Sequence, residues 1–251
     1  MRFAARTMFC IDSPIRRWAL LASFSLLASS ALAQPNPSRA AAAPRRERVL
    51  LFVGDVMLSR GVGARMKSEG DWVYPFQKIA ETLSAADLTF ANLEGPVSDV
   101  GRDRHHLYSF RADPEAIEGL QLAGFDVTAV ANNHMYDWGP EALLDTLRRL
   151  REAGIQPVGA GANDLQAHYP LLVDLEGVQL AFLAYASVEP KAAVAGPDKA
   201  GVAWLEPDRV LADIRFARPL ADLVIVCLHW GIEYATRRGL MLKVKLIDTQ
   251  I

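Results

Sequence analysis

Side chains that can bind metal ions follow short apolar runs at four places in the sequence. They are Asp55; Asn92 and Glu94; Asn132, Asn133 and His134 with Asp137 close behind; and His229. Carboxylate, amide and imidazole groups offer oxygen and nitrogen ligands, and no thiolate stands among them. The combination suits one or two divalent ions such as Mn, Zn, Fe or Mg.

Four of these residues have a structural explanation when each is considered alone. Asp55 follows a glycine and could cap a turn, and Asp137 could cap the helix that begins near Pro140. Glu94 could be a solvated turn residue, and His229 could be a core histidine with satisfied hydrogen bonds. It is their joint occurrence at the ends of strand-like runs that favours a metal site.

The apolar runs have the length and composition of buried strands. They are Val49–Val53, Leu88–Phe90, Val127–Val130, Leu171–Val173, Leu180–Leu183 and Leu223–Val226. An unbroken apolar run, without alternation, is typical of a parallel-sheet strand that is covered on both faces. The sequence predicts such a strand at Val49–Val53.

Two helices are predicted between these strands. The first spans Pro140–Glu152, with an apolar stripe of Leu143, Leu144, Leu147 and Leu150 and a stop at Gly154. The second begins at Pro114 and ends at Gly124, just before a strand. Helices that end in glycine and lead into strands indicate an α/β domain with a largely parallel core. Ligands collect at the carboxyl ends of such strands, where the polar residues lie.

Five segments of the sequence together resemble a known family. They are Gly54–Arg60, Ala91–Pro96, Ala131–His134 with Asp137–Gly139, Gly159–Asn163 and His229–Tyr234. In this order they resemble the motifs of the CapA family, the poly-gamma-glutamate capsule synthesis proteins related to calcineurin-like metallophosphatases. The resemblance spans about Val49 to Tyr234. It implies a metallophosphatase-like layered α/β sandwich with a divalent metal site.

The resemblance also implies roles for individual residues. Metal ligands would be Asp55, Glu94, Asn133 and His229, and His134 beside them would protonate a leaving group or hold a transition-state oxygen. Glutamate at position 94 agrees with the CapA pattern but differs from the usual aspartate of the wider superfamily, which leaves the number of ions open.

Further polar residues near this set are candidates for substrate binding. They are Arg60, Asn92, Arg111, Asn132 and Asp137. The two arginines could clamp an anionic group such as a phosphate or a polymer carboxylate, because guanidinium groups pair well with both. Histidines at positions 105, 106 and 168 are expected to lie in solvated loops.

Two kinds of function remain open at this point. The first is metal-dependent hydrolysis or transfer on a phosphoester or polymer amide during capsule or poly-gamma-glutamate synthesis. The second is a non-catalytic subunit that binds or guides an anionic polymer in the same crevice, with membrane-bound capsule synthesis subunits as expected partners. The net charge of −2 gives no reason to expect nucleic acid as a partner.

The N-terminus has the pattern of an export signal. Residues 1–33 combine Arg16-Arg17, an apolar run and the ending Ala31-Leu32-Ala33. A linker rich in Pro, Ala and Arg follows at 34–48, and the CapA-like domain is expected over 49–251. The protein is therefore expected to work in the periplasm or outside the cell, with membrane association as an alternative.

Removal of the signal would change the charge and the thiol content. It would take away four basic residues and one acidic residue, leaving 23 basic and 28 acidic ones, a net charge of −5. Cys10 would be lost with it, and Cys227 lies in an apolar run where it is expected to be buried. No intrachain disulfide is then possible, so stability must come from the core.

The family pattern changes near the end of the sequence. CapA proteins continue after the His-Trp-Gly motif to a further strand and a His-rich loop, which the resemblance implies as a source of more imidazole ligands. Here the sequence departs after Tyr234, and no histidine follows His229. We therefore expect a sandwich that is incomplete at the C-terminus, with weak metal binding, little hydrolytic activity and an exposed edge strand that favours association.

Cleavage of the signal gives a direct test. The A-x-A ending at Ala33 predicts that N-terminal sequencing of exported protein begins at or near Gln34. Protein that retains Met1 and sediments with membranes would contradict cleavage and indicate an uncleaved anchor.

Overall fold

The computed structural model describes residues 47–187, 191–231 and 242–248, the last of these as backbone only. All of them belong to one unit, Arg46–Ile251. The expected signal at 1–33, most of the expected linker at 34–48 and the motif residues 232–234 lie outside the described part. Among the described residues no helix is both long and apolar enough to cross a membrane.

The first sheet has four strands, all parallel, in the order β1-β2-β3-β4. Its strands are β1 (Leu50–Val56), β2 (Leu88–Leu93), β3 (Val127–Ala129) and β4 (Gln156–Val158). Every residue of β2 is buried, whereas β1 at the edge of this sheet is half-buried or exposed. The prediction of a parallel strand at Val49–Val53 is confirmed by β1, but the prediction that it is fully covered on both faces is wrong, because its residues are only half-buried or exposed.

The second sheet is mixed, in the order β10-β9-β7-β6. Its strands are β6 (Leu171–Leu175), β7 (Val178–Ala186), β9 (Leu223–His229) and β10 (Leu242–Asp248). Strands β7 and β9 are parallel, and β6 and β10 run antiparallel to them. Strand β10 pairs along β9 and is itself the outer strand of the described sheet.

A tight turn explains the antiparallel pairing of β6 with β7. Glu176 and Gly177 connect the two strands and have φ of 50° and 88°. Two consecutive left-handed residues are the mark of a type I′ hairpin turn, and glycine adopts this conformation without strain. The sequence prediction of a largely parallel core therefore holds for the first sheet and for one strand pair of the second.

Helices and a small third sheet complete the fold. The helices are α1 (Arg60–Glu69), α2 (Ala80–Ser84), α3 (Ile117–Leu122), α4 (Gly139–Glu152), α5 (Asp164–His168) and α6 (Pro207–Ala217). Short 3-10 turns are η1 (Pro114–Ala116), η2 (Lys191–Ala193) and η3 (Arg218–Leu220), and β5 (Ala160–Gly161) pairs with β8 (Gly201–Val202).

Both predicted helices are present. The helix predicted at Pro140–Glu152 is α4, and its inner face is formed by Leu143, Leu147 and Leu150, whereas Leu144 is exposed. The helix predicted from Pro114 begins as η1 and continues as α3. Gly124 and Gly154 both follow their helices with positive φ, as a glycine stop requires.

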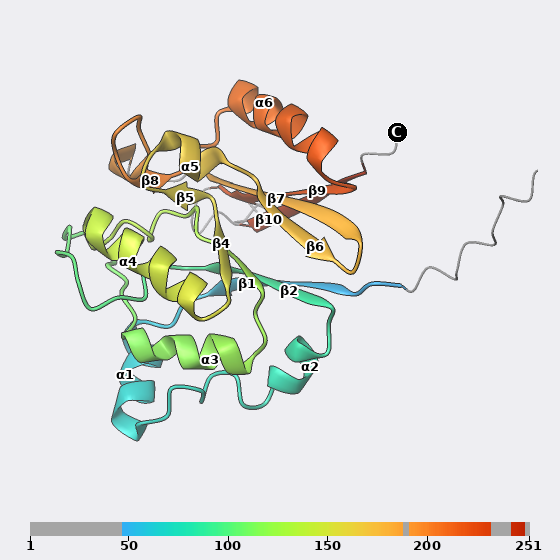
Figure 1. Ribbon diagram of the computed structural model, residues 1–251. Coiled ribbons are helices and arrows are strands. Elements are labelled where there is room, and N and C mark those ends of the chain that lie inside the picture. Colours follow the sequence, from blue (N-terminus) through green and yellow to red (C-terminus); the bar gives the residue numbers. More distant parts are fainter. Residues whose placement is uncertain (1–46, 188–190, 232–241, 249–251) are drawn as a thin grey trace, which may run out of the picture. The chain divides into compact units, whose positions relative to one another are not determined.

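The two main sheets pack against each other, and helices cover their outer faces (Figure 1). Phe90 of β2 stacks on Phe182 of β7 with ring centroids 5.7 Å apart. In β7 the residues on the side of Phe182 join this central core, while the alternating ones, such as Leu183, pack with α6. Strand β9 divides its residues in the same way. This two-sided burial explains the unbroken apolar runs and confirms the layered α/β sandwich.

Two further sequence expectations have clear outcomes. Cys227 is buried and unpaired, and burial raises the pKa of its thiol. The placement of His168 in a solvated loop is wrong: it is buried, and its Nδ1 lies 2.7 Å from Asp213 Oδ2 in α6. His105, in contrast, is exposed.

Candidate metal centre

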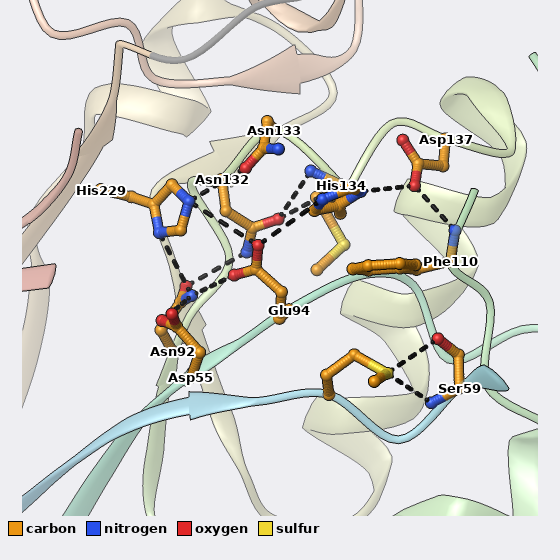
Figure 2. Close-up of polar contacts among 12 residues, drawn as sticks. Asp55, Ser59, Asn92, Glu94, Phe110, Asn132, Asn133, His134, Asp137 and His229 are labelled. Carbon is orange, nitrogen blue, oxygen red and sulfur yellow. Dashed lines mark hydrogen bonds and ion pairs between the residues drawn. The ribbon is translucent and has the colours of Figure 1, made fainter. Parts of the chain in front are cut away.

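The predicted polar residues meet at one edge of the first sheet. Strands β1, β2 and β3 are parallel, so their carboxyl ends lie together. A bulge in β1 between Phe52 and Asp55 places Asp55 opposite Asn92 of β2. His229, the last residue of β9, reaches the same place from the second sheet, as Figure 2 shows. The polar group expected at the strand ends is therefore supplied by both sheets.

Three of the predicted metal ligands form one group. Asp55, Glu94 and His229 each offer a ligand atom, and these atoms all lie within 4.8 Å of one another. Glu94 and His229 are 9% and 1% exposed, whereas Asp55 is exposed. Two oxygen ligands and one nitrogen ligand from partly buried side chains suit a divalent ion.

The amide of Asn92 lies at the centre of this group. Its Nδ2 is 2.8 Å from Asp55 Oδ1, 2.5 Å from Glu94 Oε2 and 3.4 Å from His229 Nδ1. An amide nitrogen has only two hydrogens, so it cannot satisfy three acceptors at once. This excess of acceptors is the chemical setting that a cation would complete, and the residues present therefore fit a divalent metal.

Burial shifts the pKa values of two members of the group. Desolvation, followed by the nearby charge of Asp55, raises the pKa of Glu94 to about 7. Desolvation lowers the pKa of His229 and outweighs the opposite effect of Asp55. Both shifts oppose the charged forms of these side chains. A neutral imidazole is also the form that binds metal.

Asn133 extends the group on the side of His229. Its Oδ1 lies 2.9 Å from His229 Nε2, which is also 3.7 Å from Glu94 Oε1. An amide oxygen accepts hydrogen bonds, so His229 carries its proton on Nε2 in this arrangement and leaves Nδ1 as an acceptor. The structure thus places Asn133 beside the other predicted ligands.

Asn132 supports the site through hydrogen bonds to the residues around it. It is 0% exposed, and its Nδ2 donates to Asn92 Oδ1 and to the main-chain oxygen of Leu93. Its Oδ1 accepts from the main-chain N–H groups of His134 and Met135. With these bonds made inside the protein, Asn132 and the equally buried Asn92 orient the neighbouring side chains. The substrate contact expected for both residues stays a prediction.

His134 faces the group from its other side. Its Nε2 is 4.0 Å from Glu94 Oε1, and its Nδ1 is 2.8 Å from Asp137 Oδ2. The carboxylate holds the proton on Nδ1 and directs Nε2 toward the metal ligands. Asp137 also accepts from the main-chain N–H of Phe110, at 2.8 Å. It therefore serves the imidazole, and helix α4 begins without a side-chain cap.

The two predicted substrate arginines lie outside this group. The Arg60 guanidinium lies over the rings of Tyr108 and Phe110, at 5.3 and 5.8 Å from their centroids. Arg111 stacks on Trp138 at 3.5 Å. Within the described residues no ion pair joins either arginine to a carboxylate. Aromatic contacts therefore hold both cations near the site.

Sequence reasoning missed Phe110. Its ring stacks on the imidazole of His134, with centroids 3.8 Å apart and an angle of 22° between the planes. The residue lies in the long connection between β2 and η1, whose sequence shows no regular pattern. The one available signal was its position next to Arg111.

The fold and the site together define an α/β protein with a partly buried group of oxygen and nitrogen donors that fits a divalent metal, and a His–Asp pair beside it. The family model of the bacterial capsule synthesis protein PGA_cap matches residues 49–239, and the chain belongs to this family. The CapA resemblance of the sequence motifs is thereby confirmed.

Two curated relatives come from Bacillus. The capsule biosynthesis protein CapA of Bacillus anthracis is 31% identical over 193 residues, which cover 74% of this chain and 47% of the relative. The PGA biosynthesis protein CapA of Bacillus subtilis is 30% identical over 191 residues, covering 73% and 49%. The chain thus spans about half the length of these relatives.

A solved structure is also similar. The crystal structure of a phosphatase from Mycoplasma pneumoniae matches with a TM-score of 0.40 and 18% identity, covering 74% of this chain and 57% of that one.

Removal of single ligands tests the metal centre. Asp55→Ala and His229→Ala should each weaken Mn²⁺ binding by about tenfold or more, because each removes a ligand atom from the group. The exposed controls Asp198→Ala and His105→Ala should leave it unchanged. Isothermal titration calorimetry provides the measurement, and equal affinities in all four variants would contradict this ligand set.

Glu94 predicts a pH-dependent stability of the metal-free protein. Its pKa rises from 4.5 to about 7 on folding, so folding favours the protonated form. The resulting stabilisation is complete below the unfolded pKa and is lost as the pH rises through the folded one. Between about pH 5 and about pH 8 the free energy of unfolding should fall by roughly 2 to 3 kcal/mol from this group.

Urea unfolding in the presence of a chelator measures this loss. Glu94→Gln should lack it, and the exposed control Glu118→Gln should keep it. The same pH dependence in Glu94→Gln and in the unsubstituted protein would show that Glu94 is not responsible.

Proposed function

We propose that this domain is a metal-dependent hydrolase that acts on a phosphoester or an amide of an anionic substrate in capsule or poly-gamma-glutamate synthesis. The observation that carries the proposal is the His134–Asp137 pair facing the group of Asp55, Glu94 and His229. Membership of the capsule synthesis family and the names of the Bacillus relatives support the pathway.

The metal would be held by the residues at the strand ends. Asp55, Glu94 and His229 supply the ligand atoms, with Asn133 next to them. A divalent ion bound there supplies Lewis-acid chemistry, polarising a phosphoryl or acyl oxygen and activating water for attack. The proposal includes Mn, Zn, Fe or Mg as the metal, bound as one ion or as two.

His134 moves the proton. With Nδ1 bound to Asp137, its Nε2 is the nitrogen that faces the site and can give a proton to a leaving group. The buried carboxylate of Asp137 stabilises the charged imidazolium that this step needs. The pair thus performs the acid part of the reaction next to the residues that would hold the metal.

A second function uses the same crevice for binding alone. Arg60 and Arg111 are held on aromatic rings, and the described residues provide neither with a carboxylate partner. Two cations arranged in this way favour an anionic polymer as ligand, whether or not a bond is broken. In that case the protein would be a polymer-binding subunit that works with membrane-bound synthesis proteins.

The predicted export signal supports a location outside the cytoplasm, with membrane association as the alternative. Residues 1–33 carry the charged start, apolar run and A-x-A ending of a signal peptide. We place the proposed reaction in the periplasm or outside the cell, where capsule polymers are exposed.

His134→Gln separates the two functions. With Mn²⁺ present, the rate of hydrolysis of p-nitrophenyl phosphate or of a gamma-glutamyl anilide should fall by about 10² or more. Mn²⁺ affinity should stay within about twofold, because His134 is outside the ligand group. His105→Gln is the matched control and should retain both properties.

Calorimetry with poly-gamma-glutamate completes this test. Unsubstituted protein that binds Mn²⁺ and the polymer but hydrolyses neither probe would overturn the hydrolase and support the binding subunit.

A further inference from the structure

The connection between β2 and η1 is closed at its base. Val97 and Ala112 form a bridge, and the main-chain N–H of Ser98 and of Ala112 donate across it at 3.1 and 2.9 Å. Phe110 is only two residues from this bridge. Its position is therefore set by main-chain bonds, unlike that of the exposed Leu107 further out in the same loop.

The same loop is bonded to the turn that carries His134. The main-chain N–H of Arg104 donates to the main-chain oxygen of Asp137 at 2.8 Å, and that of Arg102 donates to the oxygen of Trp138 at 3.0 Å. These bonds tie the loop to the turn at Asp137 and at the residue that follows it. Phe110 and His134 therefore belong to two segments that are fixed relative to each other.

Phe110 makes two separate contacts with the His134–Asp137 pair (Figure 2). Its ring covers one face of the imidazole at 3.8 Å. Its main-chain N–H donates to Asp137 Oδ2, the oxygen that also faces His134 Nδ1. One residue thus limits rotation of the imidazole and fixes the carboxylate that selects its tautomer.

Gly95 shows how closely this arrangement is packed. It has φ of 105°, and a Cβ atom placed there would lie 2.9 Å from Phe110 Cβ. Only glycine fits both the conformation and the close approach. Gly95, which follows Glu94, is therefore in contact with Phe110, and Phe110 covers His134.

Phe110 contributes little to the core itself. It is half-buried and is not a member of either cluster of buried apolar side chains among the described residues. Its ring instead faces an imidazole on one side and lies 5.8 Å from the Arg60 guanidinium. A role confined to core packing would not require these polar neighbours.

We propose that Phe110 is a positioning residue that holds the His134 imidazole in the Nδ1-protonated tautomer with Nε2 toward the metal ligands. The consequence for the reaction rests on the proposed hydrolase function. The orientation of the ring can be tested without any activity.

Nitrogen NMR of histidine in the metal-free protein gives that test. The tautomer of each neutral imidazole is read from its two nitrogen shifts, and the His134 signal is assigned by its loss in His134→Gln. Phe110→Leu should change this signal from the Nδ1-protonated pattern to an average of both tautomers. Phe110→Tyr, which keeps the ring, should restore the original pattern.

Phe125→Leu is the matched control, because Phe125 is buried next to Phe76 and away from the site. It should leave the His134 signal unchanged. An unchanged signal in Phe110→Leu, or the same change in Phe125→Leu, would overturn the proposal.

Turnover then tests the consequence for the reaction. In Phe110→Leu the kcat for p-nitrophenyl phosphate should fall by about tenfold, with KM within about twofold, because the proton donor is misplaced while binding is kept. Phe110→Tyr should recover most of kcat. If the unsubstituted protein hydrolyses nothing but the NMR changes occur, the hydrolase proposal fails and the positioning role stands.

Discussion

The site depends on one constraint, which is the number of hydrogens on a single amide. Asn92 offers two, and three acceptors from Asp55, Glu94 and His229 surround it. Placing two carboxylates and an imidazole around one donor, largely away from water, is unfavourable unless a positive charge joins them. The raised pKa of Glu94 expresses the same conflict. The arrangement of acceptors at this edge of the sheet therefore suits a cation.

Parallel strands make that arrangement possible. In the first sheet β1, β2 and β3 all end at one edge, and the bulge in β1 aligns Asp55 with Asn92. The buried amide of Asn132, in the turn that follows β3, then bonds to Asn92 and Leu93 of β2. Packing of Phe90 on Phe182 brings the second sheet, and with it His229, to the same place. The core thus determines the distances between groups that carry charge.

Local sequence patterns were sufficient for six strands, β1, β2, β3, β6, β7 and β9, and for most of the polar group, because each ligand follows an apolar run. They failed where a partner is distant in the chain. His168 resembled a loop residue since its partner Asp213 is 45 positions away, and Phe110 lies in a connection without periodicity. The short strand β4 was missed because it contains Pro157, which is compatible with its place at the edge of the sheet. The role of Asn132 required knowledge of hydrogen bonds between strands.

The difference in exposure within the metal group gives the site a direction. Glu94 and His229 are closed off from solvent, and Asp55 is open to it. An arriving ion would meet Asp55 first and would shed its hydration on the way inward, and a departing ion would leave Asp55 last. Asp55 would therefore set the rate at which ions exchange with the solvent. The two buried ligands would set the affinity for the bound ion.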